Sequence, residues 1–206
     1  MNQSTTLRRL GAEQKLIHAK IKSGELDIVF HNTGSDLTTM KFTIKGPIGS
    51  VYEGGSFDVC FNYPQEYPIK PPNVFFLTNI WNCNISYDNG AVCLETLQKD
   101  WTPSVRSDRI IYSIYTLMLC PNPDSAFHDY IGAQYKNNKD LYDETARYWT
   151  TKYAGGQNQF PEFDTKVRLL MNEGFGERKS VEKLSIFNWD VDKSREMVLR
   201  ELNEQF

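Results

Sequence analysis

Apolar residues at the start of the chain repeat with the spacing of an amphipathic helix. Leu7, Leu10, Ile17 and Ile21 recur close to the 3.6-residue period, and Gly24 ends the pattern. After this glycine the period changes to two. Four runs rich in strand-forming residues follow, separated by turn residues, at positions 26–31, 38–46, 56–64 and 73–78. The pattern predicts a helix followed by four strands.

The second of these runs indicates how the sheet is covered. Met40, Phe42 and Ile44 fall on one face, whereas the alternate positions are polar. An antiparallel sheet of this kind keeps one face in water and packs the other against the core. We therefore predict an antiparallel meander whose apolar face is covered by a helix.

The next part of the chain, residues 79–105, has no sustained hydrophobic period. It is rich in Asn, Asp and Gly, yet it also holds Trp81, Cys93 and Trp101. A long irregular stretch inside a compact domain is more often functional than accidental. Helical periodicity then returns and predicts three helices, at residues 106–119, 127–135 and 141–153.

A second boundary follows these helices. Residues 155–162 are rich in Gly, Gln and Asn around a proline, which is typical of a linker. Beyond it, three short helical patterns at 165–172, 177–187 and 192–203 predict a small three-helix bundle. The whole pattern predicts an α+β fold, with a core domain over residues 1–154, a linker over 155–162 and the bundle over 163–206.

Composition narrows the classes of protein to which the chain can belong. Apolar residues make up 40% and aromatic residues 13%, which is enough for a packed core. The 23 basic and 26 acidic residues give a net charge of −3, which argues against a dedicated nucleic-acid binder. No apolar run approaches the ~18 residues of a membrane span, and the first residues lack the apolar stretch of a secretory signal. We expect a cytoplasmic or nuclear protein that binds neither nucleic acid nor membranes.

The four cysteines are candidate reactive groups. Cys60, Cys83, Cys93 and Cys120 have no Cys-x-x-Cys spacing and the three histidines lie far apart, so we expect no metal site. Strand alternation places Cys60 on the outer face of the sheet, and Cys120 ends an apolar helix; we predict that both are structural. Cys93 lies in an irregular, glycine-flanked segment, where the residues alone are equally compatible with a nucleophile and with an inert thiol.

The order of the predicted elements, together with several local motifs, resembles the ubiquitin-conjugating enzyme fold over residues 5–154. The motifs are Tyr52–Gly55, the proline-rich segment 63–72, Ala91-Val92-Cys93-Leu94 followed by Asp100–Pro103, Pro121–Asp124, and Ala146–Trp149. The tail, with its Gly174-Phe175 turn and Asn188–Val191, resembles a ubiquitin-associated (UBA) domain. A conjugating core followed by one such domain is similar to the subgroup that builds polyubiquitin chains.

The resemblance implies a reaction and roles for particular residues. Cys93 would accept ubiquitin from the activating enzyme as a thioester and pass it to a lysine amine. Asn84 would stabilise the oxyanion of this transfer or, alternatively, close a turn through its own backbone. Ser125, beside Asp124, would position the incoming lysine, or the two would cap a helix. No cofactor is implied, because ATP is used by the upstream activating enzyme.

The same resemblance implies partner surfaces. The partners are ubiquitin, the activating enzyme, a ligase of the RING or HECT type, and protein substrates. The residues implied for ligase binding are Ile69, Pro103 and Ser104, and those for the activating enzyme are Arg8, Arg9 and Lys15. A charged helix face is usually only solvated, so the second assignment has that alternative. In the tail, Gly174 and Phe175 correspond to weak ubiquitin contacts.

Two departures from the family pattern affect these expectations. Where the family has His-Pro-Asn before the cysteine, this chain has Asn82-Cys83-Asn84. The change raises the alternative of a weakly active or inactive subunit that regulates or binds; conjugation of another ubiquitin-like modifier is a third reading. In the tail, Glu173 stands where the Met of a Met-Gly-Phe turn is typical, which predicts weakened binding of monoubiquitin.

Overall fold

The computed structural model describes residues 3–31, 34 and 36–203. Residues 1, 2, 32, 33 and 35 of the expected core domain and 204–206 of the expected bundle lie outside the described ranges. Its elements follow in the order α1 (Gln3–Lys22), β1 (Ile28–His31), β2 (Thr39–Lys45), β3 (Ser56–Asn62), β4 (Asn73–Phe76), the short 3₁₀ helix η1 (Glu95–Leu97), α2 (Ser107–Leu119), the 3₁₀ helix η2 (Pro123–Ser125), α3 (Asp129–Asn137), α4 (Lys139–Ala154), α5 (Pro161–Asn172), α6 (Glu177–Ile186) and α7 (Val191–Asn203). Within the described ranges, no helix combines the length and the apolar character needed to cross a membrane.

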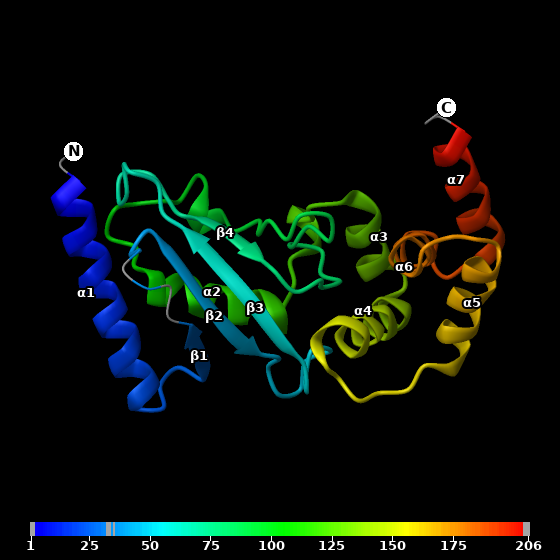
Figure 1. Ribbon diagram of the computed structural model, residues 1–206, viewed down its shortest axis with the longest axis horizontal. Coiled ribbons are helices and arrows are strands. Elements are labelled where there is room, and N and C mark those ends of the chain that lie inside the picture. Colours follow the sequence, from blue (N-terminus) through cyan, green and yellow to red (C-terminus); the bar gives the residue numbers. More distant parts are fainter. Residues whose placement is uncertain (1–2, 32–33, 35, 204–206) are drawn as a thin grey trace.

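The four strands form one antiparallel sheet in the order β1-β2-β3-β4 (Figure 1). Phe42 of β2 lies opposite Val59 of β3, which in turn lies opposite Phe76 of β4. Met40, Phe42 and Ile44 are buried while their neighbours along β2 are not, so the predicted alternation is confirmed. The fold is therefore α+β, as the pattern predicts.

The apolar face of the sheet is covered by α2, which runs behind it in Figure 1. Ile110, Ile111 and Ile114 of α2 are fully buried in the same apolar cluster as Phe42 and Val59 of the sheet. Burying aliphatic side chains of this size stabilises the fold by about 1.5–3 kcal/mol each. The sheet and α2 therefore share one apolar core.

A buried carboxylate fixes α1 to the loops around it. Glu13 is only 3% exposed and accepts hydrogen bonds from the Tyr67 hydroxyl at 2.8 Å and from the backbone N–H of Ser107 at 2.8 Å. The Arg9 guanidinium pairs with the same carboxylate and also donates to the carbonyl of Val105 at 3.3 Å. A buried charge is tolerated when it is paired and hydrogen-bonded in this way.

The three C-terminal helices α5, α6 and α7, called here the C-terminal bundle, pack against α3 and α4. The indole N–H of Trp189 donates to Oγ1 of Thr145 on α4 at 2.9 Å, and its ring stacks on Phe163 with centroids 3.6 Å apart. Trp189 and Phe163 belong to the same buried cluster as the sheet. The first helix of the bundle begins at Pro161, inside the expected linker 155–162.

The two cysteines predicted to be structural differ in burial. Cys60 alternates with the inward Phe57, Val59 and Phe61, as strand alternation predicts for the outer face, yet it is only 5% exposed. Its neighbours in register are Lys41 and Phe75, and larger side chains on adjacent strands cover a small one between them. Cys120, expected to fill the end of an apolar helix, is exposed at the C-terminal end of α2.

The helix expected at 127–135 begins later, at Asp129. The backbone N–H of Phe127 donates to the carbonyl of Cys83 at 2.5 Å, and this bond ties residue 127 to the Cys83 backbone before the helix begins. The delayed start therefore reflects a tertiary contact that local periodicity does not contain.

Candidate active site

Cys93 lies at the end of a folded loop, residues 79–93, called here the Cys93 loop. The backbone N–H of Cys93 donates to the carbonyl of Asn84 at 2.8 Å, and Ser86 donates to Ala91 at 2.9 Å. Gly90 makes the return possible, because it has φ +73° and a Cβ there would lie 1.9 Å from the carbonyl oxygen of Phe76. The loop is thus held in one shape by its own backbone and by β4.

A hollow of about 260 Å³ opens beside Cys93. Its walls are formed by the Cys93 loop, η1, α2 and η2 with the residue before it, and the lining residues include Asn84, Cys93, Thr116, Asn122 and Ser125. Cys93 is partly exposed, and Nε2 of Gln98 lies 3.5 Å from its Sγ. The sequence reasoning missed Gln98, since it lies beyond the motif that carries Cys93. A partly exposed thiol beside a hollow that a substrate can enter is suited to nucleophilic chemistry.

Asn84 is buried and joins the Cys93 loop to η2. Its Nδ2 donates to the carbonyl of Asn122 at 2.8 Å and to that of Ser125 at 3.0 Å, while its Oδ1 accepts from the N–H of Asn122 at 2.7 Å. Both hydrogens of the amide are therefore engaged. The Asn84 side chain therefore bridges two loops. It does not close a turn through its own backbone, the alternative that the sequence left open.

Asn82 and Cys83, the residues that depart from the family pattern, are fully buried. Nδ2 of Asn82 donates to the Tyr52 hydroxyl at 3.0 Å and to the carbonyl of Leu117 at 3.3 Å, and its Oδ1 accepts from the N–H of Asn84 at 2.8 Å. An asparagine at this place thus satisfies its own amide and fixes the backbone of Asn84.

The structure brings Ser125 to the hollow but places Asp124 elsewhere. Ser125 is among the lining residues beside Cys93. The Asp124 carboxylate is 82% exposed, pairs with Nζ of Lys136 at 2.5 Å, and lines a neighbouring groove between η2 and α3. Of the two residues expected to position an incoming lysine, Ser125 has the better placement.

Burial affects the protonation of Cys60 and Cys83. Burial raises the pKa of Cys83 to about 11 and also raises that of Cys60. A raised thiol pKa keeps the proton on sulfur until the pH approaches that value, and the protonated thiol is a poor nucleophile. At neutral pH both side chains are therefore unreactive.

We expect alkylation of the folded protein by iodoacetamide at about pH 8 to modify Cys93 and Cys120 and to spare Cys83. Peptide mass spectrometry measures the result, and the unfolded protein, in which all four cysteines react, is the control. Modification of Cys83 as fast as Cys93 would show that the Cys93 loop opens readily.

The residues expected to face a ligase lie on two loops that touch. The indole N–H of Trp101 donates to the carbonyls of Pro68 at 3.0 Å and Ile69 at 3.1 Å, joining segment 68–70 to segment 101–104. Ile69 is 60% exposed, and Pro103 and Ser104 are exposed beside it. An exposed aliphatic side chain on a fixed loop is a typical anchor for a protein partner.

The three basic residues of α1 do not form one free face. Arg8 and Lys15 are exposed, whereas Arg9 is half-buried and bonded to Glu13. Arg9 therefore supports the packing of α1, and only Arg8 and Lys15 remain available to a partner.

In the C-terminal bundle, Glu173 is paired rather than free. Nε and Nη2 of Arg195 each approach its carboxylate at 2.7 Å, and these bonds lower the pKa of Glu173. Phe175 of the adjacent turn packs against the core cluster, and Gly174 is exposed with φ +94°. The turn keeps its apolar residue but carries a fixed negative charge beside it.

We expect the full-length protein to bind monoubiquitin with a Kd weaker than about 1 mM, because the Glu173 carboxylate would lose water against an apolar surface. Glu173→Met should strengthen the binding, measured by titrating isotope-labelled protein. Glu173→Gln, which removes the charge without adding an apolar side chain, is the matched control. Clear sub-millimolar binding by the wild type, unimproved by Glu173→Met, contradicts this expectation.

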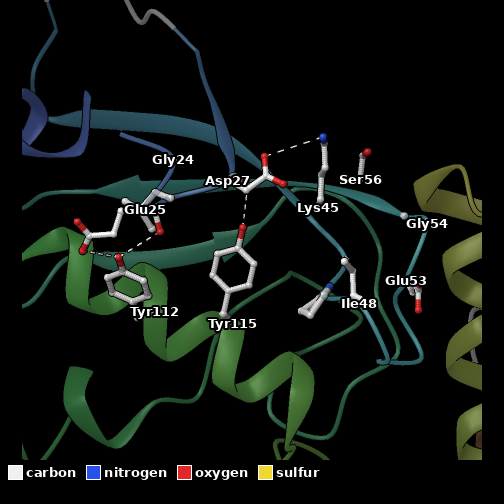
Figure 2. A pocket seen from close by; sticks show the side chains of 14 residues that line it. Gly24, Glu25, Asp27, Lys45, Ile48, Glu53, Gly54, Ser56, Tyr112 and Tyr115 are labelled. Atoms are coloured by element: carbon white, nitrogen blue, oxygen red, sulfur yellow. Dashed lines mark hydrogen bonds and ion pairs between the residues drawn. The ribbon is translucent and has the colours of Figure 1, made fainter. Parts of the chain in front are cut away.

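A larger hollow lies elsewhere, between α2 and the ends of β1–β3, and measures about 810 Å³ (Figure 2). The Tyr115 hydroxyl donates to the carbonyl of Asp27 at 2.7 Å, and the Tyr112 hydroxyl donates to the Glu25 carboxylate at 2.9 Å. Lys45 lies 3.9 Å from Asp27. These polar groups satisfy one another, and the residues that line this hollow differ from those around Cys93.

Comparison with known proteins agrees with the resemblance. The family model for ubiquitin-conjugating enzymes matches residues 9–150. The Drosophila melanogaster ubiquitin-conjugating enzyme E2-22 kDa is 36% identical over 159 residues, covering 77% of this chain and 80% of that protein. Human ubiquitin-conjugating enzyme E2 K is 31% identical over 193 residues, covering 94% of this chain and 96% of that protein.

The fold agrees as well. The E2 domain of a Toxoplasma gondii ubiquitin conjugating enzyme superposes with a TM-score of 0.61 at 30% sequence identity, covering 69% of this chain and 99% of that one. The predicted conjugating fold is confirmed. The chain belongs to the ubiquitin-conjugating enzyme family.

Proposed function

We propose that the chain accepts ubiquitin from an activating enzyme as a thioester on Cys93 and passes it to a lysine amine. The observation that carries the proposal is the placement of Cys93, a partly exposed thiol in a hollow shared with Asn84 and Ser125. The other cysteines of the Cys93 loop and the sheet are buried with raised pKa values. The family to which the chain belongs supports the same chemistry.

The reaction has two acyl transfers. The Cys93 sulfur attacks the thioester between ubiquitin and the activating enzyme, and the enzyme's thiol leaves. A lysine amine then attacks the new thioester carbonyl, loses a proton, and releases the Cys93 thiol as the amide forms. Both Nδ2 hydrogens of Asn84 bond to carbonyls, those of Asn122 and Ser125. The main role of Asn84 is therefore to hold Ser125 beside Cys93.

The partner surfaces and the type of product are proposed from the resemblance to the family. The loops joined by Trp101 would present Ile69, Pro103 and Ser104 to a RING or HECT ligase, and Arg8 with Lys15 would meet the activating enzyme. We also propose that the protein builds polyubiquitin chains, because a conjugating core followed by a C-terminal bundle resembles the chain-building subgroup.

The replaced His-Pro pair favours one alternative, a subunit with little transfer activity. The hydrogen bonds of Asn82 oppose it, because they fix the backbone of Asn84 without a histidine or a proline.

Incubation with activating enzyme, ATP and ubiquitin separates the two. We expect a band on a non-reducing gel, heavier by one ubiquitin, that disappears with reductant and is discharged by free lysine. A chain that forms no such band, or forms one that lysine does not discharge, is the regulatory subunit instead. Human E2 K, treated alongside, verifies the reagents.

A further inference from the structure

The C-terminal bundle reaches the base of the Cys93 loop through hydrogen bonds to the buried Gln134; the acceptor Asn188 lies at the exposed end of this connection. The indole N–H of Trp81, the residue before Asn82, donates to Oε1 of Gln134 on α3 at 2.9 Å. Nε2 of Gln134 donates to Oδ1 of Asn188 at 2.9 Å and to the carbonyl of Ser185 at 3.3 Å. Trp81 is fully buried and Gln134 is 5% exposed, so one amide connects the two parts of the chain inside the protein.

A second indole contact runs beside the first. The N–H of Trp149 on α4 donates to Oγ of Ser185 at 2.9 Å, and its ring centroid lies 5.3 Å from that of Trp81. Ser185 is fully buried and donates in turn to the carbonyl of Val181 within α6. Trp81 in the Cys93 loop and Trp149 beside it thus both depend on groups that α6 and the turn after it hold in place.

The orientation of Gln134 follows from the bundle. An amide side chain presents its oxygen and its nitrogen to opposite sides, so acceptors at Ser185 and Asn188 turn the oxygen toward Trp81. Asn188 is held in the turn between α6 and α7 with φ +54°, where asparagine is tolerated better than most residues. Without these acceptors the Gln134 amide would be free to turn away.

From Trp81 the connection continues to the cysteine. The carbonyl of Trp81 accepts from the Tyr52 hydroxyl at 2.7 Å, and that hydroxyl accepts from Nδ2 of Asn82 at 3.0 Å. Oδ1 of Asn82 accepts from the N–H of Asn84, whose carbonyl accepts from the N–H of Cys93. The links from Trp81 to Asn84 are buried, where hydrogen bonds are stronger than in water.

We infer that Gln134, Ser185 and Asn188 are positioning residues for transfer from Cys93, so that the C-terminal bundle is part of the catalytic unit. This inference rests on the proposed function. An error of about 1 Å near reacting atoms can slow a reaction by about 10²-fold. Attachment to Cys93 by exchange with another enzyme's thiol depends less on η2 and Ser125, so transfer to lysine should be the sensitive step.

Variants at Asn188 test the inference in the full-length protein. Asn188→Gly removes the acceptor and keeps the backbone, because glycine adopts positive φ without strain. Asn188→Asp retains an acceptor oxygen. Ser194→Ala is the matched control, since the Ser194 hydroxyl is buried within the bundle and donates to the carbonyl of Asp190, away from α3.

Two measurements are made on each variant: single-turnover discharge of the ubiquitin thioester onto lysine, and the indole ¹H–¹⁵N resonance of Trp81. We expect Asn188→Gly to discharge about three- to tenfold more slowly, with charging unchanged and the Trp81 resonance moved. Asn188→Asp should recover discharge, and Ser194→Ala should change neither measurement. If Asn188→Gly does not fold, Gln134→Met, which removes all three hydrogen bonds of the amide at similar volume, is judged by the same criteria.

Two outcomes overturn the inference. The first is normal discharge by a variant whose Trp81 resonance has moved; the second is equal slowing by Ser194→Ala, which would reflect general loosening of the bundle. Failure of the wild type to form a thioester would instead refute the proposed function. Thioester formation and its discharge are read from the same gel, so the two failures are distinguished.

Discussion

Cys93→Ser should hold ubiquitin as an oxyester that survives reductant, and its transfer to lysine should fall to background. A serine hydroxyl can still be acylated in the same hollow, but an alkoxide is a much poorer leaving group than a thiolate. Cys93→Ala should form no adduct at all. Non-reducing and reducing gels after incubation with activating enzyme, ATP and ubiquitin distinguish the three proteins.

Cys83→Ala is the control for this experiment. Cys83 is fully buried, and its pKa is raised to about 11, so its removal should leave the thioester intact. The cost should appear as lost stability, because the cavity left in a packed core destabilises by about 24 cal/mol for each Å³. An adduct that persists in Cys93→Ala and disappears in Cys83→Ala would move the nucleophile to the buried position.

Asn84→Ala should slow discharge onto lysine by about 10²-fold and affect charging much less. The substitution removes three hydrogen bonds that tie the Cys93 loop to Asn122 and Ser125. Without them η2 is free to withdraw Ser125 from Cys93. Single-turnover discharge of preformed thioester measures the effect separately from charging.

Asn84→Asp distinguishes a loop bridge from an oxyanion donor that acts without it. A carboxylate would face the carbonyls of Asn122 and Ser125, so its repulsion should displace η2 further than alanine does. Amide resonances of Asn122 and Ser125 in the uncharged protein should move in both variants. Unmoved resonances together with slow discharge would contradict the bridge and assign Asn84 to the oxyanion alone.

Much of the fold could be predicted because local sequence controls it. The period of two in β2 and the period of 3.6 in α2 describe faces that are buried in the structure. In α1 the same period places Leu10 and Ile17 in the core, whereas Leu7 is exposed. Glu13 shows where local reasoning stops. It lies between Leu10 and Ile17 on the buried face of α1, yet its partners Tyr67 and Ser107 are distant in sequence.

The candidate site divides in the same way. Its irregular, glycine-flanked segment set Cys93 apart from the other cysteines, but only the family resemblance favoured a nucleophile there. The direction of the Asn84 amide could not, because it depends on the carbonyls of Asn122 and Ser125, which arrive from beyond α2. Asp124 and Ser125 are adjacent, and only the ion pair of Asp124 with Lys136 shows that they face different hollows.

The sequence of α4 also contains a sign that the C-terminal bundle packs against it, although helical periodicity alone does not reveal it. Tyr148 and Trp149 are adjacent on α4, so they point about 100° apart and cannot both face a single core. Both are almost fully buried, since Tyr148 lies against Trp189 while Trp149 bonds to Ser185. A helix with aromatic residues on more than one side indicates a second packing partner.

The placement of α1 and the C-terminal bundle at opposite ends of the molecule has a consequence for assembly (Figure 1). A macromolecule seated on Arg8 and Lys15 leaves the outer surfaces of α5 and α7 uncovered. Occupancy at one end therefore does not exclude occupancy at the other, and a single chain can bridge two bodies at once. Because the bundle is packed on α3 and α4 rather than tethered, the distance between those bodies is fixed, and their effective concentration is set by geometry rather than by the length of a linker.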